Sequence, residues 1–286
     1  MKKLIEAYER VKEERIRGAF WSANIMAKAI IEDAQNGLIS CDNIDRVTRL
    51  IISANVTMAS LWNLADVLRN GCNLGYDVLS SARKFLWYMG YSRELLSSVA
   101  NNLAHEKMII TTLSYSSSIE LVLLTLKNYL NKVFISISEP GGEGIEFAKN
   151  LRRSGIEVNV IYDAMLPHAV EKSTLVLIGA DSVTLDGCVF NKVGSLMLAM
   201  ISSIYKIPFA SIFESFKIHR HLKCNDVKIE YRTSRINHWG DLSYPLFDKI
   251  PSSYIKFVIT EYGITEFNRE RLLESLDKMR STINES

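Results

Sequence analysis

The sequence lacks an apolar run long enough to cross a membrane, and it does not open with the charged and then apolar leader of a secreted protein. Lys2 and Lys3 lead into an amphipathic segment instead. Cysteine is scarce: four scattered residues form no Cys-x-x-Cys pair, which predicts free thiols and no metal site. These absences together predict a cytoplasmic protein that binds neither zinc nor a membrane.

Two nucleotide-binding signatures are also missing. No Gly-x-Gly-x-x-Gly fingerprint is present, which disfavours a nicotinamide-dependent dehydrogenase. The glycine-rich stretch from Glu139 to Gly144 lacks the Gly-Lys-Ser/Thr ending of a Walker A loop. Its carboxylates, Glu139 and Glu143, oppose phosphate binding unless they are paired. We therefore expect no cofactor.

Charge of neither sign dominates, since 34 lysines and arginines face 32 aspartates and glutamates for a net charge of +2. This balance excludes the strongly basic surface of a dedicated nucleic-acid binder. A hydrophobic content of 48% over 286 residues suits one large domain or two of moderate size. No repeat, low-complexity segment or Pro/Gly linker separates the two halves, so we expect them to pack against each other.

The hydrophobic period changes near Lys107. Before it, apolar residues recur at helical spacing, and Asp77 is predicted to cap one helix, Gly90 to end it and Ser92 to cap the next. After it, apolar runs alternate with helices, which implies a parallel sheet with right-handed crossovers. Strands are predicted at residues 108–112, 133–138, 158–162, 175–178, 208–213 and 254–260. The predicted fold class is α/β, with a helical N-terminal domain over residues 1–105 and a Rossmann-like parallel-sheet domain over residues 106–286.

Asp181 is the first candidate for site chemistry. It follows a buried apolar run, Leu175 to Ile178, at the strand end where ligands of open α/β sheets bind. A carboxylate there suits a general acid or base, or a partner for a ligand hydroxyl. A structural cap or a subunit contact is the alternative. A short polar loop with a tight turn at Asp186-Gly187 is predicted to come next.

Asn191 and Lys192 stand just before Gly194 at the expected start of a helix, and Lys217 follows the next predicted strand. Because a helix N-terminus attracts anions, lysines beside it suit a phosphate. Gly194 would let the backbone approach such a ligand. The structural alternative is an N-cap asparagine with surface lysines whose aliphatic chains pack on the protein and whose ammonium groups stay in water.

Ser116 and Ser117 lie at another predicted helix start. Free backbone N–H groups and hydroxyls at such a position can bind phosphate. Capping of the helix explains the same residues without any ligand. Both interpretations stay open for this pair.

Short motifs recur in one order from end to end of the chain. They are RGA at 17–19, TLSYSS at 112–117, GAD at 179–181, NKVG at 191–194, ESFK at 214–217 and FVITEYGIT at 257–265. In this order they resemble the initiation factor 2B α/β/δ family, which also contains the ribose-1,5-bisphosphate and methylthioribose-1-phosphate isomerases. The resemblance implies a cleft between a helical domain and a Rossmann-like domain.

The resemblance also implies roles for single residues. In the isomerases, an aspartate at the position of Asp181 acts with a cysteine in aldose–ketose conversion, and the matching position here is Ser114. A hydroxyl is a far weaker acid than a thiol, and no base stands beside it in the sequence, although a distant side chain could supply one. Arg17, Gly18 and Ala19 match ligand contacts of the isomerases.

Another departure concerns Asn55, which stands where the isomerases carry a phosphate-holding arginine. With Ser114, it favours a non-catalytic homologue of the initiation factor 2B regulatory subunits. A ribose-1,5-bisphosphate-type isomerase is the alternative, and a sensor that binds a sugar phosphate or nucleotide without turnover is a third possibility. Turnover of ribose-1,5-bisphosphate distinguishes them.

Partners follow from the resemblance as well. It implies a homodimer formed through the C-terminal domain, with Tyr244, Phe247 and Tyr254 as candidates for the apolar contact or for plain core packing. Initiation factor 2 and a phosphorylated metabolite are the other expected partners, and translation initiation is the expected context.

Overall fold

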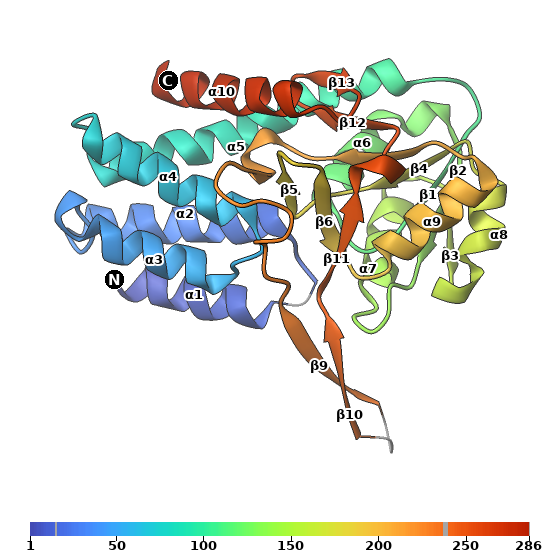
Figure 1. The fold of residues 1–286 in the computed structure, drawn as a ribbon, viewed down its shortest axis with the longest axis horizontal. Helices are drawn as coiled ribbons and strands as arrows, with labels where there is room; N and C mark the ends of the chain where they lie inside the picture. The colour runs from blue at the N-terminus through green and yellow to red at the C-terminus, as the bar shows by residue number, and fades with distance from the viewer. Residues whose placement is uncertain (15, 237–239, 286) are drawn as a thin grey trace.

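The computed structural model describes residues 1–14, 16–236 and 240–285, and its N-terminal part is helical, as predicted. The helices are α1 (Lys2–Glu13), α2 (Ala19–Gln35), α3 (Ile44–Ala54), α4 (Ala59–Asn73) and α5 (Val78–Ala100). Each buries an apolar stripe, because residues three and four apart share one helix face. In α1 this stripe is Leu4, Ala7 and Val11. The C-terminal helix α10 (Arg269–Glu285) lies beside α5 (Figure 1).

Helix α5 is longer than predicted. Asp77 caps it as expected, accepting a hydrogen bond from the Ser80 backbone N–H at 2.6 Å. The predicted stop at Gly90 and the predicted new cap at Ser92 are wrong, because the helix continues through both residues. A glycine costs a helix about 1 kcal/mol, whereas the face carrying Phe85 and Leu96 is fully buried on both sides of it.

The large sheet has seven strands in the order β13-β12-β7-β4-β1-β2-β3 among the described residues. Its strands are β1 (Met108–Thr112), β2 (Leu130–Ser136), β3 (Val158–Ile161), β4 (Leu175–Ile178), β7 (Phe209–Ile212), β12 (Phe257–Thr260) and β13 (Gly263–Thr265). All pairings are parallel except that of β12 with β13. The helices that follow strands are α6 (Ser117–Thr125), α7 (Glu143–Arg153), α8 (Leu166–Glu171) and α9 (Ser195–Tyr205). The predicted α/β fold with a mostly parallel sheet is confirmed.

The strand order reverses between β1 and β4. From β1 the chain builds outward through β2 and β3, then returns to the other side of β1 for β4 and β7. Such a switch point opens a crevice at the carboxyl ends of the two central strands. Ser114 comes two residues after β1, and Asp181 comes three residues after β4. The topology therefore brings the two candidate residues to the same crevice.

A second sheet follows β4, where only a polar loop was predicted. It has the order β11-β6-β5-β8 and consists of β5 (Ser182–Thr184), β6 (Cys188–Lys192), β8 (Ile218–His219) and β11 (Phe247–Pro251). The tight turn at Asp186-Gly187 is correct, because it joins β5 to β6. The loop prediction failed because Val183, Val189 and Phe190 are fully buried in strands too short to show a pattern.

A two-stranded hairpin of β9 (Tyr231–Ile236) and β10 (Gly240–Pro245) projects from the body of the molecule (Figure 1). At its base, Tyr244 and Phe247 are buried within the chain, 8% and 3% exposed. Tyr254 packs against the same core. Tyr244 and Phe247 therefore belong to the core, which agrees with the packing alternative, while Tyr254 is only partly buried.

The four cysteines form two disulfides, Cys41–Cys72 and Cys188–Cys224. The prediction of free thiols is therefore wrong. Spacing along the sequence did not suggest either pair, since 31 and 36 positions separate the partners. The first joins the short turn before α3 to the end of α4, and the second links β6 to the segment that leads into β9. Both pairs thus link pieces of chain that only the fold brings together.

One apolar cluster runs from the N-terminal helices into the sheet, so the two parts pack against each other as expected. The ring of Phe216, after β7, lies 6.1 Å from that of Phe85 in α5. Within the described part of the chain, none of the helices combines the length and the apolar character needed to cross a membrane. The described residues also include no cluster of histidine, cysteine, aspartate and glutamate suited to a metal ion.

Candidate functional site

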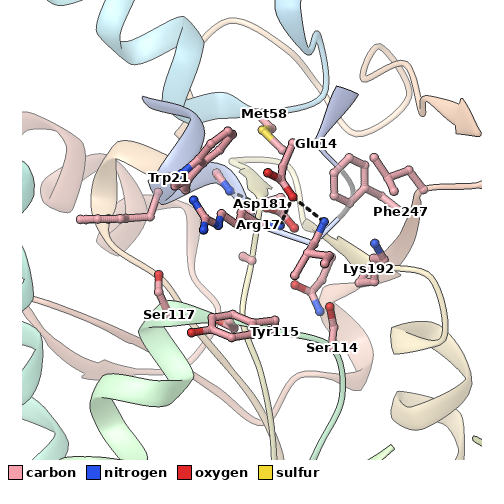
Figure 2. A pocket seen from close by; sticks show the side chains of 18 of the residues that line it. Glu14, Arg17, Trp21, Met58, Ser114, Tyr115, Ser117, Asp181, Lys192 and Phe247 are labelled. Carbon is pink, nitrogen blue, oxygen red and sulfur yellow. Dashed lines mark hydrogen bonds between the residues drawn. The ribbon is translucent and has the colours of Figure 1, made fainter. Parts of the chain in front are cut away.

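A cavity of about 950 Å³ lies between the connection from α1 to α2 and the carboxyl ends of β1 and β4. Figure 2 shows Arg17 and Asp181 near its centre, with Trp21 and Met58 on one side and Ser114, Tyr115 and Ser117 on the other. The cavity brings together all the candidate residues from the sequence: Arg17, Gly18, Ala19, Ser114, Ser116, Ser117, Asp181, Asn191, Lys192 and Lys217.

Asp181 joins the helical part to the sheet at this cavity. Its carboxylate accepts a hydrogen bond from the Ala19 backbone N–H at 2.8 Å, across 162 positions of sequence. A Cβ atom on Gly18 would lie 2.8 Å from the same oxygen, so any larger residue there would have to displace the Asp181 carboxylate. Burial raises the pKa of Asp181, while Lys217, the Ala19 N–H and Lys192 oppose that rise. The carboxyl group is therefore readier than usual to hold a proton.

Ser114 is held in a left-handed backbone conformation, with φ at 61°. Such a conformation is uncommon outside glycine and persists only where neighbouring groups impose it. Here the Ser114 N–H donates to Ser138 Oγ at 2.6 Å, and the Ser114 hydroxyl donates to Glu143 Oε1 at 2.8 Å. Both acceptors lie after β2, in the connection to α7 and at the first residue of that helix, and they fix Ser114 on the cavity wall.

Glu143 was missed as a site residue. It is the first residue of α7 and is buried, and its Oε1 lies 3.1 Å from Lys192 Nζ. The sequence beside Ser114 offers no base, but this distant carboxylate reaches its hydroxyl. One indication of this role was present in the sequence, because Glu139 and Glu143 were expected to oppose phosphate binding unless they were paired.

A second buried ion pair holds Lys217. Its Nζ lies 2.8 Å from Glu214 Oε2 and donates to Ser118 Oγ at 2.9 Å. Arg93 approaches the other carboxylate oxygen at 3.8 Å. Burial alone would raise the pKa of Glu214, but Lys217 and Arg93 bring it below its ordinary value. Each cavity lysine is thus backed by a buried carboxylate.

The N-terminus of α9 is not open to a ligand, contrary to the prediction. The Asp248 carboxylate accepts from the backbone N–H groups of Gly194 at 2.8 Å and Leu196 at 2.9 Å. This aspartate comes from β11, more than 50 positions later, so local sequence did not reveal it. Asn191 still lines the cavity, and its amide donates to Ser195 Oγ at 2.8 Å.

The N-terminus of α6 remains beside the cavity. Ser116 caps the helix by accepting from the Ile119 N–H at 3.3 Å, so the capping interpretation is confirmed for it. Ser116 and Ser117 also line the cavity, which leaves the first turn of α6 facing a ligand. Asn55, in contrast, lies outside the cavity lining and donates to Glu230 at 2.9 Å.

Aromatic residues of the cavity were also missed, because they fitted the apolar stripes of helices. The guanidinium groups of Arg10 and Arg17 lie 5.5 and 5.3 Å from the Trp21 ring. Cation–π contact of this kind holds a guanidinium in place. The Glu14 carboxylate accepts from the Arg17 backbone N–H at 3.0 Å (Figure 2). Arg17 is therefore fixed at the cavity by both its backbone and its side chain.

Comparison with known proteins identifies the relatives of this chain. The model of the initiation factor 2 subunit family matches residues 15–267. A Pyrococcus horikoshii protein described as translation initiation factor eIF-2B subunit 2-like is 34% identical over 268 residues, 92% of this chain and 96% of the relative. The crystal structure of translation initiation factor eIF-2B from P. horikoshii OT3 has a TM-score of 0.86 at 32% identity and covers 94% of this chain and 99% of that one.

An enzyme is similar over the same length. Ribose 1,5-bisphosphate isomerase of Methanocaldococcus jannaschii is 27% identical over 280 residues, which cover 91% of this chain and 90% of the enzyme. The similarity runs from end to end for factor-like and isomerase relatives alike. The predicted resemblance is confirmed, and the chain belongs to the initiation factor 2 subunit family.

Proposed function

We propose that this chain is a non-catalytic, regulatory-subunit-like member of its family, whose cavity binds a sugar phosphate or a nucleotide. Ser114 is the observation that supports this most. A hydroxyl stands on the cavity wall where the isomerases are expected to carry a reactive thiol, and its proton is already donated to Glu143. A hydroxyl does not ionise near neutral pH without a strong base. Similarity to the subunit 2-like relative agrees with this proposal.

The charges of the cavity support a ligand that combines an anion with hydroxyl groups. Arg17, Lys192 and Lys217 face it as cations, and the first turn of α6 contributes backbone N–H groups at Ser117. Asp181 stands opposite as an acceptor, or as a donor when it is protonated, for a hydroxyl. A phosphorylated sugar carries both kinds of group, and so does a nucleotide.

A sugar-phosphate isomerase is the second candidate. Two observations favour it: Asp181 and Ser114 line the same cavity, and Glu143 accepts the Ser114 proton. In this case Asp181 would move the proton between adjacent carbons of the substrate, and Ser114 would act with Glu143 as the second acid–base group. The weak acidity of the hydroxyl is what argues against it.

Turnover of ribose-1,5-bisphosphate separates the two candidates. The unmodified protein is expected to bind this sugar phosphate in calorimetry without forming a ketose product. Asp181→Asn is expected to bind it more weakly, because a ligand hydroxyl loses its charged partner. Ser114→Cys is expected to gain product formation, because a thiol is a far stronger acid and nucleophile than a hydroxyl. The assay is product detection by phosphorus NMR on the same samples.

Product from the unmodified protein, lost in Asp181→Asn, contradicts the non-catalytic proposal and supports the isomerase. Absence of both binding and product contradicts a cavity for sugar phosphates. The proposal then reduces to a protein partner, and capture of purified initiation factor 2 is the next measurement. A role beside that factor would place the chain in the cytoplasm, which is part of this proposal.

We also propose a homodimer, formed through the α9 face of the C-terminal part. Met197, Met200 and Ile204 of α9 repeat at helical spacing and are 42%, 48% and 76% exposed. An exposed apolar stripe of this kind is typical of a protein–protein contact. In Figure 1, α9 lies on the side of the molecule away from the N-terminal helices, where a second copy has free access.

Light scattering after size exclusion tests this contact. The unmodified chain is expected at twice 32.4 kDa, and Met200→Glu is expected to shift it to the monomer mass, because a charge buried in an apolar contact costs several kcal/mol. Leu74→Glu, at a more exposed apolar position in the helical part, is the control and is expected to remain a dimer. A Met200→Glu variant with the parent's mass would exclude α9 as the interface.

A further inference from the structure

Glu143 lies behind the cavity wall, not in it. The residue begins α7, is 1% exposed and does not contribute to the cavity lining. Two side chains that do line the cavity, Ser114 and Lys192, both reach back to its Oε1, at 2.8 and 3.1 Å. The influence of Glu143 on a ligand is therefore exerted through these two residues.

The bond from Ser114 sets the direction of hydrogen bonding at this point of the wall. A serine hydroxyl has one proton and accepts through its lone pairs. Because the proton is given to a carboxylate, which cannot donate, Ser114 presents only lone pairs to the cavity. A ligand group next to Ser114 must then be a donor. A hydroxyl meets that condition, whereas a phosphate oxygen near neutral pH does not.

The ion pair with Lys192 acts in the same direction. A carboxylate 3.1 Å behind the ammonium cancels much of the positive charge that Lys192 presents to the cavity. Oε2 of Glu143 is buried and has no hydrogen-bond partner among the described residues. The corner therefore carries a concentrated negative charge just behind its surface. An incoming phosphate is therefore attracted to this corner less strongly than it would be to Lys192 without Glu143.

Arg17 and the first turn of α6 stand at a different part of the same cavity. Figure 2 shows Ser117 and Ser114 on either side of Tyr115, with Arg17 above them. The Arg17 guanidinium lies over the neutral Trp21 ring and forms no ion pair with a carboxylate among the described residues, since Glu14 accepts from the backbone N–H of Arg17 and not from its side chain. The cavity thus has a more cationic end near Ser117 and an acceptor end at Ser114.

We propose that Glu143 is a positioning residue that makes the Ser114–Lys192 corner receive a hydroxyl of the ligand in preference to a phosphate. This inference rests on the proposed function, because it assumes a phosphorylated ligand that also carries hydroxyl groups. It assigns the orientation of that ligand: the phosphate lies toward Arg17 and Ser117, and a sugar hydroxyl points at Ser114. Neither Ser114 nor Lys192 could impose this selection without the carboxylate behind them.

A cysteine placed at position 114 reports on Glu143 without any ligand. The native cysteines are joined in disulfides, so Ser114→Cys introduces a single free thiol. The carboxylate disfavours the thiolate and Lys192 favours it. We expect Glu143→Gln in this background to lower the thiol pKa by about one unit, which raises the iodoacetamide rate at pH 7 about tenfold. Glu171→Gln, at an exposed position at the end of α8 and outside the cavity lining, is the control and leaves the rate unchanged.

A complementary variant covers the case in which Glu143→Gln does not fold. In the Ser114→Cys background, Lys192→Met leaves Glu143 as the charge next to the thiol, so the pH profile of alkylation is expected to move upward by about one unit. Circular dichroism checks that each variant is folded. Alkylation profiles that coincide in the folded variants and the Ser114→Cys parent would overturn the proposal.

Calorimetry with inorganic phosphate and ribose 5-phosphate tests the selection itself. Glu143→Gln in the native background is expected to bind inorganic phosphate about tenfold tighter than the parent, because the charge behind Lys192 is gone. Its preference for ribose 5-phosphate over phosphate is expected to shrink. An unchanged preference would overturn the selection. A shifted thiol profile with no binding of either probe to the parent supports the positioning by Glu143 and contradicts the proposed function instead.

Discussion

Replacing Glu214 with glutamine is expected to lower the free energy of unfolding by about 3 to 5 kcal/mol. The Glu214 side chain is fully buried, and Lys217 beside it is 4% exposed. Removing the carboxylate leaves an ammonium group 2.8 Å away without its charged partner. It also leaves the Arg93 guanidinium without the anion at 3.8 Å. An uncompensated buried charge of this kind is far costlier than the pair was favourable.

Urea denaturation at pH 7 measures the change. The double variant Glu214→Gln with Lys217→Met is expected to recover at least half of the loss, because methionine fills similar space without a charge. Glu157→Gln is the control, since its pair with Lys132 at 3.2 Å is exposed and screened by water. A Glu214→Gln variant as stable as the parent would mean that water or another anion already compensates Lys217.

The pH dependence of this pair has a definite sign. The pKa of Glu214 lies below its ordinary value of 4.5, because Lys217 and Arg93 outweigh the opposing effect of burial. An acid with a lowered pKa contributes stability that is present above its unfolded pKa and is lost as the pH falls through its folded pKa. The difference between the parent and Glu214→Gln is therefore expected to shrink in acid.

Glu261 is expected to produce the opposite pH dependence, changing the free energy of unfolding by about 3 kcal/mol. Burial raises the pKa of this carboxyl from 4.5 to about 7, against the hydrogen bonds that Ser215 and Tyr88 donate to it. The residue is 3% exposed, so solvent screening is small. An acid with a raised pKa contributes stability that is complete below the unfolded value of 4.5 and is lost as the pH rises through about 7.

Glu261→Gln is the test, because glutamine keeps the shape and does not ionise. Relative to the parent, the variant is expected to gain about 3 kcal/mol of unfolding free energy between pH 4.5 and pH 8. The difference between variant and parent is measured because His219 also makes the free energy of unfolding depend on pH. Burial lowers the pKa of His219 to about 4, which gives a slope of opposite sign that is common to both proteins and cancels in the difference. Glu266→Gln, at an exposed position in the same segment, is the control. A difference that stays constant with pH would rule out a raised pKa for Glu261.

Elements with a long or continuous pattern could be predicted from the sequence. Leu175–Ile178 is apolar throughout because β4 is buried on both faces, and its limits were correct. The turn at Asp186-Gly187 was also correct, but the strands on either side have three and five residues and were missed. Gly90 shows the opposite failure, because burial along α5 outweighed a local signal to stop.

The candidate site divides in the same way. Motif order was enough to gather Arg17, Ser114 and Asp181 in one cavity. The groups that hydrogen-bond to the site residues or pair with their charges were not predictable, because each comes from a segment that is distant in the sequence. Glu143 is 29 positions from Ser114, and Asp248 reaches the start of α9 from 52 and 54 positions away. Ion pairs and caps between distant segments leave no periodic signal in a single sequence.

The hydrogen bond from the Ala19 N–H to Asp181 makes the exchange rate of one backbone amide a measure of how often the cavity opens. A buried, bonded amide exchanges its proton with water only in the moments when the bond is broken. Here that bond is also the contact between the start of α2 and the carboxylate of the candidate site. The rate of deuterium uptake at Ala19 therefore reports how often the hydrogen bond between the helical part and Asp181 breaks. A ligand that binds the Asp181 carboxylate is expected to change that rate.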